Sequence, residues 1–167
     1  MKSYIIISFA LFFLTGCVAR EYHRTSAVLV EVPPVGQALS APLSFGWPVN
    51  GQITEPYGSL KDGVTLRGVM IEAPAGSEVV AAGAGRVSFV DQHLKGYGKT
   101  LIIEHGGELH TVYARVSEIL VTPGQDVQAG QAIARMAAPA GLGRPVLYFE
   151  IRKKSRPEPP LIYLKRR

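Results

Sequence analysis

The chain has 167 residues, of which 47% are hydrophobic and 19% charged, and its formal net charge at pH 7 is +5. This hydrophobic content excludes an intrinsically disordered chain, and the length predicts one folded domain with an appendage. The charge is too mild and too scattered to predict binding to nucleic acid. The abundance of Gly (18) and Pro (12) favours short strands joined by turns over long helices.

The N-terminus has the pattern of a bacterial lipoprotein signal peptide. A positive start at Lys2 precedes an apolar run, Tyr4–Leu14, that is too short to cross a ~30 Å hydrocarbon core as a helix. The run ends in Leu14-Thr15-Gly16-Cys17, which resembles the lipobox, where cleavage precedes the cysteine and lipid is attached to its sulfur. Cys17 is the single cysteine. We predict a signal peptide over residues 1–16 and lipidation of Cys17; the alternative is a plain signal peptide with an incidental cysteine.

The residue after Cys17 bears on the membrane to which the anchor belongs. It is Val18, whereas bacterial retention signals usually carry Asp there. By resemblance to enteric sorting rules, we expect a protein anchored in the outer membrane and facing the periplasm. Several acyl chains, at ~0.8 kcal/mol per buried methylene, would make such anchoring permanent.

Residues 17–44 are expected to form an unstructured tether that carries the lipidated cysteine. They show no sustained periodicity and are interrupted by Pro33-Pro34, Gly36 and Pro42, although Val28–Val32 has the composition of a short strand. A coil of this length spans about 30 Å, and ~90 Å when fully extended. The domain that follows would therefore reach the peptidoglycan layer.

From Phe45 onward, short alternating segments are separated by turn signals, which predicts an all-β, antiparallel domain. His105-Gly106-Gly107-Glu108 is a hairpin signal between two of the segments. Ser117–Leu120 is the one candidate for a short helical piece. The expected strands are Gln52–Pro56, Gly68–Glu72, Glu78–Ala81, Gly85–Asp91, Lys99–Glu104, Leu109–Arg115, Asp126-Val127, Ala132–Met136 and Val146–Arg152.

A series of short motifs resembles LytM-type, lysostaphin-like zinc peptidase domains. The motifs run in the family's order from Phe45 to Leu164, so the resemblance implies a LytM-type all-β domain over residues 45–164, with a basic tail at 165–167. They include Trp47-Pro48-Val49-Asn50-Gly51, Ala73-Pro74-Ala75-Gly76, Gly96-Tyr97-Gly98, Tyr113-Ala114 and Phe149-Glu150-Ile151-Arg152.

The residues that hold zinc in active members of this family are replaced in this chain. The family's ligands come from a His-x-x-x-Asp pattern and the second His of a His-x-His; the first His of that pair and a His after Tyr-Ala assist the zinc-bound water. The corresponding positions carry Leu66 and Met70, then Val146 and Tyr148, and Arg115 after Tyr-Ala. Leu and Val have no donor atom, a thioether is a poor zinc ligand, and arginine is permanently cationic. We therefore expect no catalytic residue, no metal site, no cofactor and no endopeptidase activity.

The histidines that remain do not rebuild a metal site. No two of them have the spacing of a metal-ligand pair, so we expect exposed or hairpin-end side chains. Strict alternation along Leu109–Arg115 would place His110 on the face opposite Arg115. Gly83-x-Gly85 has no phosphate-loop context and is interpreted as a turn. The four histidines are His23, His93, His105 and His110.

The resemblance implies a role that does not need zinc. Degenerate LytM domains, including lipoproteins, activate N-acetylmuramoyl-L-alanine amidases by displacing an autoinhibitory helix. We therefore expect a non-catalytic lipoprotein that binds an amidase and peptidoglycan during cell separation or wall remodelling. The apolar replacements have two interpretations. They either fill the space left by the polar zinc ligands, which lowers the desolvation cost, or they line a groove that binds an apolar partner. The expected groove residues are Leu66, Met70, Tyr97, Arg115, Val146 and Tyr148.

Two other functions remain open at the level of sequence. One is a peptidoglycan-binding or envelope-assembly scaffold that activates no amidase, and the other is a residual hydrolase that uses unrecognised residues. Two small basic clusters, Lys153-Lys154 with Arg156 and Lys165-Arg166-Arg167, are either solvated surface or sites of attraction for anionic wall polymer or lipid headgroups.

Overall fold

The computed structural model describes residues 44–61, 63–138 and 143–167. The expected signal peptide, Cys17, His23 and all of the tether before Ser44 lie outside the described residues. Within those ranges the one helix is a three-residue 3-10 turn, η1 (Pro160–Ile162). None of the described helical segments is long and apolar enough to cross a membrane.

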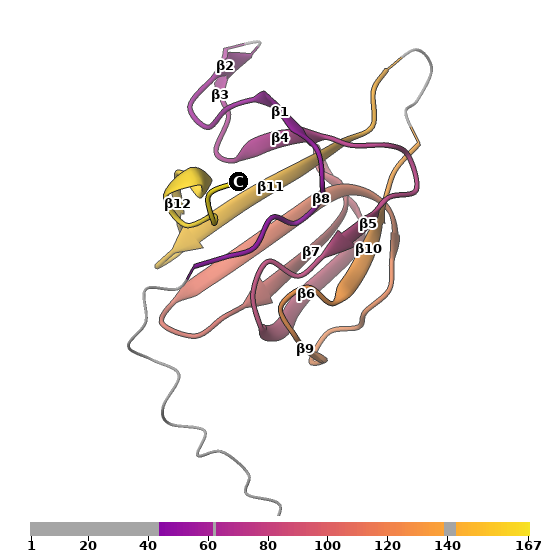
Figure 1. Ribbon diagram of the computed structural model, residues 1–167, viewed down its shortest axis with the longest axis vertical. Helices are drawn as coiled ribbons and strands as arrows, with labels where there is room; N and C mark the ends of the chain where they lie inside the picture. The colour runs from indigo at the N-terminus through magenta and orange to yellow at the C-terminus, as the bar shows by residue number, and fades with distance from the viewer. Residues whose placement is uncertain (1–43, 62, 139–142) are drawn as a thin grey trace, which may run out of the picture. The chain divides into compact units, whose positions relative to one another are not determined.

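The domain is built on one antiparallel ten-stranded sheet, in which seven strands follow the order β1-β4-β11-β8-β7-β6-β9 (Figure 1). β10 pairs with both β8 and β5, and β12 pairs with β11. A separate two-stranded sheet joins β2 (Leu60–Lys61) to β3 (Val64–Thr65). The sheet strands are β1 (Gln52–Glu55), β4 (Val69–Glu72), β5 (Glu78–Val80), β6 (Gly85–Leu94), β7 (Gly98–Glu104), β8 (Leu109–Ile119), β9 (Asp126–Val127), β10 (Ala132–Met136), β11 (Val146–Lys153) and β12 (Arg156–Glu158).

The two faces of the central strands bury different side chains. On β11, Leu147, Phe149 and Ile151 point into the main hydrophobic core, where all three are fully buried. Tyr148 and Glu150 alternate with them and face the other side, where Tyr148 joins a second, smaller apolar cluster. The strand is buried on both faces, which explains its nearly continuous apolar sequence.

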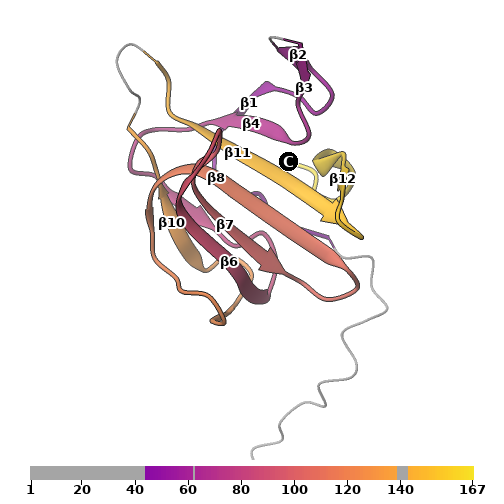
Figure 2. The ribbon, with the colours of Figure 1, turned by 180° about the vertical axis from the view of Figure 1, so that it is seen from behind.

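The antiparallel β domain expected from the sequence is confirmed, but its elements differ: β2, β3, β12 and η1 were not expected, and two of the expected segments extend further. Ser117–Leu120 is not helical, because β8 continues through Ile119 and pairs there with β10, Ala134 opposite Ile119. β6 continues to Leu94, so that β6 and β7 form a long hairpin, which faces the viewer in Figure 2. Tertiary pairing extends both strands beyond the segments in which alternation is visible.

Gly68 allows β4 to lie close against β11. A Cβ atom at this position would lie 2.3 Å from the carbonyl oxygen of Phe149, which no side chain tolerates. The absence of a side chain therefore fixes the approach of the chain to β11 just before Met70, which pairs with Tyr148. Through this contact, a glycine just before β4 positions two of the expected groove residues.

Candidate functional site

A pocket of about 580 Å³ lies where β3, β4, β11, the Gly96-Tyr97 turn and β8 meet. Five of the six expected groove residues line it: Leu66, Met70, Tyr97, Arg115 and Tyr148. We call this pocket, as defined by those five residues, the groove. The sixth expected residue, Val146, is half-buried at the start of β11 opposite Glu72 and does not line the groove.

The floor of the groove is closed and apolar. Met70 and Tyr148 are 5% and 3% exposed and pack with Val112 and Ala114 in the second apolar cluster. Tyr97 packs against this cluster, and its ring meets the ring of Tyr148 edge to face at 5.2 Å between centroids. The floor therefore offers a preformed apolar surface.

The hydroxyl of Tyr148 is already committed to a partner inside the domain. It donates a hydrogen bond of 2.6 Å to Oε2 of Glu150, a fully buried carboxylate that also accepts 2.7 Å from Nε of Arg152. Burial, and then the hydrogen bond to Glu150, hold the pKa of Tyr148 far above its ordinary value. The phenol is therefore neutral, and the buried carboxylate has both a hydrogen bond and a cation as partners.

Arg115 reaches the groove through a β-bulge. Its φ is +64°, its N–H donates to the carbonyl of Tyr97 (3.0 Å), and the pairing of β7 with β8 shifts register between Lys99 and Thr100. The extra residue turns the Arg115 side chain into the same groove as Tyr148, whose partner on β8 is Ala114. The expectation from strict alternation, that Arg115 lies on the face opposite His110, is wrong for this reason.

The rim of the groove carries residues that sequence reasoning did not single out. Glu55, Val64, Thr65 and Arg67 line it together with Leu66. Val64 is 69% exposed, and its neighbour in the hairpin, Leu60, is 73% exposed. Strands of two residues are too short to show an alternating pattern in the sequence. Only their closeness in sequence to Leu66, a position that resembles a zinc-ligand position of the family, could have indicated that these residues line the groove.

The donor atoms at the groove do not fit zinc. Leu66 has no donor, Met70 offers a buried thioether, and the neutral phenol of Tyr148 is hydrogen-bonded to Glu150. Arg115 adds a cation beside them. Among the described residues, no group of three His, Cys, Asp or Glu side chains is arranged to hold a metal ion.

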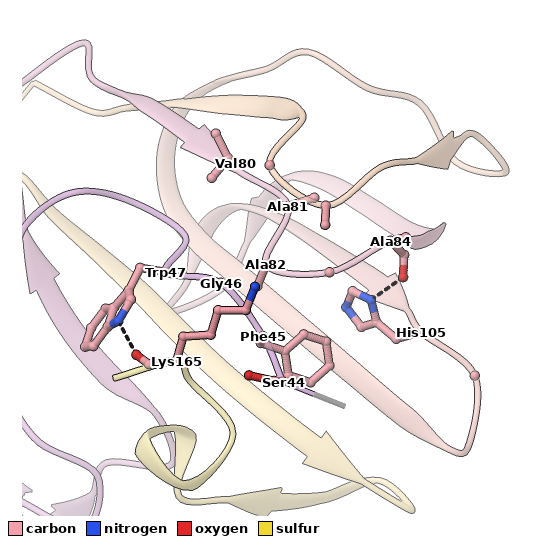
Figure 3. Close-up of a pocket in the computed structure, with 14 residues that line it drawn as sticks. Ser44, Phe45, Gly46, Trp47, Val80, Ala81, Ala82, Ala84, His105 and Lys165 are labelled. Atoms are coloured by element: carbon pink, nitrogen blue, oxygen red, sulfur yellow. Dashed lines mark hydrogen bonds between the residues drawn. The ribbon is translucent and has the colours of Figure 1, made fainter. Parts of the chain in front are cut away.

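A second pocket, of about 630 Å³, lies near the first described residues and is lined mainly by small side chains, backbone, Phe45, Trp47, His105 and Lys165 (Figure 3). Its histidine has structural partners: Nδ1 of His105 lies 2.8 Å from the carbonyl of Ala84 and Nε2 lies 2.6 Å from Oγ1 of Thr111. Burial lowers the pKa of His105 below its ordinary value. The histidine of this pocket is therefore held by contacts inside the domain, and the pocket is a weaker candidate than the groove.

The other described histidines also lie apart from the groove. His105 directly follows β7 at the expected hairpin, and His110 is the second residue of β8, where it is half-buried opposite Glu104. His93 is exposed on β6. None of the three lines the groove.

Residues 65–160 match Peptidase family M23. The chain is 39% identical over 132 residues to the uncharacterized lipoprotein YgeR of Escherichia coli, covering 79% of this chain and 49% of YgeR. It is 39% identical over 134 residues to the murein hydrolase activator EnvC of Escherichia coli, covering 80% of this chain and 30% of EnvC. It therefore spans half or less of the length of these relatives.

A solved structure, described as a zinc containing peptidase from Vibrio cholerae, resembles the domain with a TM-score of 0.62 at 32% identity, covering 70% of this chain and 39% of that one. The LytM-type fold expected from the sequence motifs is confirmed by this similarity.

Proposed function

The chain belongs to peptidase family M23, and we propose that it is a non-catalytic envelope lipoprotein that binds and activates a peptidoglycan N-acetylmuramoyl-L-alanine amidase. The observation that carries this proposal is the groove. Around the positions that, by resemblance, correspond to the family's zinc site, the chain has an apolar floor and a cation, with no imidazole and with Glu55 as the single carboxylate among the groove's lining residues. Such a surface fits a partner segment better than a hydrolytic reaction.

The chemistry of the groove defines the segment that it would bind. Met70, Tyr97 and Tyr148 offer apolar contact, and Arg115 offers a planar guanidinium for a carboxylate. An apolar peptide face with an acidic residue at its edge satisfies both features. The exposed Leu60 and Val64 of the β2–β3 hairpin enlarge the apolar contact area beyond the floor.

Activation follows when the groove prefers the open form of the amidase. An activator that binds only the open form shifts the equilibrium by its differential affinity for the two states, and ~3 kcal/mol changes the ratio about a hundredfold. The name of EnvC, murein hydrolase activator, supports a role of this class. The role proposed for this chain concerns its one described domain, which covers 30% of EnvC.

The location proposed for the chain follows from the sequence motif at Cys17. A lipid on that cysteine would anchor the protein in the outer membrane, facing the periplasm, with residues 17–44 as tether and residues 45–164 as the amidase-binding domain. The relative YgeR carries the name lipoprotein, which supports an envelope location. Peptidoglycan is then within reach of the domain, as the substrate of the partner amidase.

The test is stimulation of a purified amidase from the same bacterium on purified sacculi by residues 18–167. We expect Leu66→Glu to reduce stimulation at least tenfold, because it places a carboxylate among apolar contacts at the half-buried rim. Phe89→Glu, a change of the same kind at a 38% exposed residue on β6, is the control and should retain stimulation. Unchanged amidase activity with the wild-type domain would refute the proposal.

Two companion assays separate the rival functions. Co-sedimentation with sacculi without any effect on the amidase would favour a scaffold that binds peptidoglycan. A clearing zone in a zymogram with the purified domain alone would indicate a residual hydrolase, and comparison with and without chelator would show whether a metal supports it.

A further inference from the structure

The net charge of the chain is concentrated at its C-terminal end. Residues 153–167 contain six of the 18 Lys and Arg residues but one of the 13 Asp and Glu residues, Glu158. The remainder of the chain therefore carries equal numbers of positive and negative side chains. A charge distribution this uneven produces a local positive potential in an otherwise balanced molecule.

Four of these six cationic side chains form no ion pair and no cation–π contact with another described residue. Lys154 lies 3.5 Å from a carboxylate oxygen of Glu108, and Arg167 stacks on Trp47 and donates to backbone carbonyls. The other four are exposed and have no ion-pair partner among the described residues. They are Lys153, Arg156, Lys165 and Arg166.

Two large apolar side chains project between these cations in sequence. Leu161 and Ile162 are 53% and 70% exposed, whereas their neighbours in the same turn, Pro160 and Leu164, are buried. The N–H groups of Tyr163 and Leu164 both donate to the carbonyl of Pro160 at 3.0 Å, which fixes the turn. The fold therefore holds an apolar pair outward in solvent, in the segment of the chain that also carries the unpaired positive charges.

This segment also lies where the described chain begins. Phe45 forms a β-bridge with Leu164, and the N–H of Lys165 donates to the carbonyl of Phe45 at 2.9 Å. In Figure 1, β12 and the C-terminus lie beside β11. Phe45, near the start of the described residues, therefore lies next to Leu164 and Lys165, in the C-terminal segment that also carries the apolar pair.

We propose that Leu161, Ile162 and the four unpaired cations form a surface that docks the domain on an anionic phospholipid bilayer. The cations contact headgroup phosphates, and the apolar pair inserts at the boundary with the acyl chains. The exposed apolar pair favours a bilayer over peptidoglycan, because a polar glycan-peptide polymer offers it no apolar phase. The proposal does not depend on the groove, because none of the six proposed surface residues lines it, although Lys153 and Tyr148 both belong to β11.

The test is co-sedimentation of residues 18–167 with vesicles. This fragment lacks Cys17, the proposed site of lipidation, and contains the complete described core. We expect binding to vesicles that contain phosphatidylglycerol and phosphatidylcholine, loss of binding with rising salt, and little binding to phosphatidylcholine alone. Binding that is equal on both vesicle types, or absent from both, would overturn the proposal without recourse to any variant.

Substitutions then test which residues of the proposed surface contribute to vesicle binding. Replacing the four cations by Gln is expected to weaken vesicle binding roughly a hundredfold or more, since each contributes about fivefold. Leu161→Ser with Ile162→Ser should weaken it about tenfold. The matched control, Leu60→Ser with Val64→Ser, removes equally exposed apolar side chains from the β2–β3 hairpin and should bind as wild type.

Two further results would count against the surface. If the control pair weakened binding as much as the Leu161 and Ile162 pair, general hydrophobicity would explain the binding. If wild type bound sacculi but not vesicles, and the four Gln substitutions abolished that binding, peptidoglycan would be the partner. Thermal melting of each variant verifies folding, which substitutions at exposed positions should leave intact.

Discussion

At the scale of single residues, the buried polar groups around Tyr148 and His105 are satisfied within the protein. The hydroxyl of Tyr148 has Glu150 as its partner, and Glu150 has Arg152. His105 likewise lies between the carbonyl of Ala84 and the hydroxyl of Thr111. Ala84 contributes an acceptor, so Nδ1 of the neutral imidazole carries the proton and Nε2 accepts. Unpaired polar atoms in these places would cost stability, and these pairings avoid that cost.

His105 gives a pH dependence of stability at this scale. Burial lowers its pKa from the ordinary 6.5, so between that value and the lower native pKa the unfolded chain binds more protons than the native domain. The contribution of His105 is therefore complete above about pH 6.5 and declines as the pH falls below it. We expect a lower Tm at pH 5 than at about pH 7.5, and a smaller difference in His105→Gln.

Other groups also titrate in this range, so the comparison needs a matched variant. His93→Gln removes an exposed imidazole from β6 and should retain the pH dependence of the wild type. The assignment to His105 would be wrong if both variants showed the same difference in Tm between the two pH values.

At the scale of elements, a bulge in β8 and a short hairpin decide what the groove contains. Arg115 adopts a positive φ that L-residues disfavour, and this conformation turns its side chain toward Tyr148 and Tyr97. The β2–β3 hairpin adds Val64 and Thr65 to the rim. The apolar floor depends on regular alternation in β11 and β4, whereas the rim depends on two irregular elements.

The bulge allows stability and partner binding to be separated. Arg115→Gly should keep or raise the free energy of unfolding by up to about 1 kcal/mol, since glycine adopts positive φ without steric cost. It should nevertheless reduce amidase stimulation, because the guanidinium is removed from the groove. Chemical denaturation and the sacculus assay measure the two effects.

Arg115→Val is the contrasting variant for the bulge. A β-branched residue at positive φ is strained, and we expect it to destabilise the domain by about 1–3 kcal/mol. Equal destabilisation by Gly and Val would show that the Arg115 side chain, and not the backbone conformation, stabilises this position.

At the scale of the whole described domain, its two ends are joined. Besides the bridge between Phe45 and Leu164, Nε1 of Trp47 donates to the carbonyl of Lys165 at 2.8 Å. The guanidinium of Arg167 lies 3.8 Å from the centre of the Trp47 ring and donates to the carbonyls of Val49, at 2.9 Å, and Gly51. The last residue of the chain is therefore part of the folded domain, and the basic end is held in a defined place.

Trp47→Leu tests how much this closure stabilises the domain. It removes one hydrogen bond of about 1 kcal/mol and one cation–π contact of about 0.5–1 kcal/mol, with some packing, so we expect a loss of about 2–3 kcal/mol. The shift in the urea midpoint measures it. Tyr57→Leu, at an exposed aromatic residue with one long hydrogen bond, should cost under about 1 kcal/mol. Similar losses in both variants would contradict a special role for Trp47.

The sequence by itself determined the class of fold, the family and the loss of zinc donors. Alternation and turn residues are local signals, and they predicted most strands of the sheet. Ordered motifs identified the family, and the resemblance predicted that Leu66, Met70, Arg115, Val146 and Tyr148 stand at the family's zinc-site positions. Side-chain chemistry alone then argued against zinc, because donor atoms are a property of residue type.

Only the tertiary structure decided how these residues are arranged. Pairing with β10 extends β8 through Ser117–Ile119, the register shift against β7 places Arg115 in the groove, and the start of β11 leaves Val146 outside it. The bridge from Phe45 to Leu164 likewise brings the basic end beside the start of the domain. Each of these features arises from contacts between segments far apart in the chain, which local periodicity does not encode.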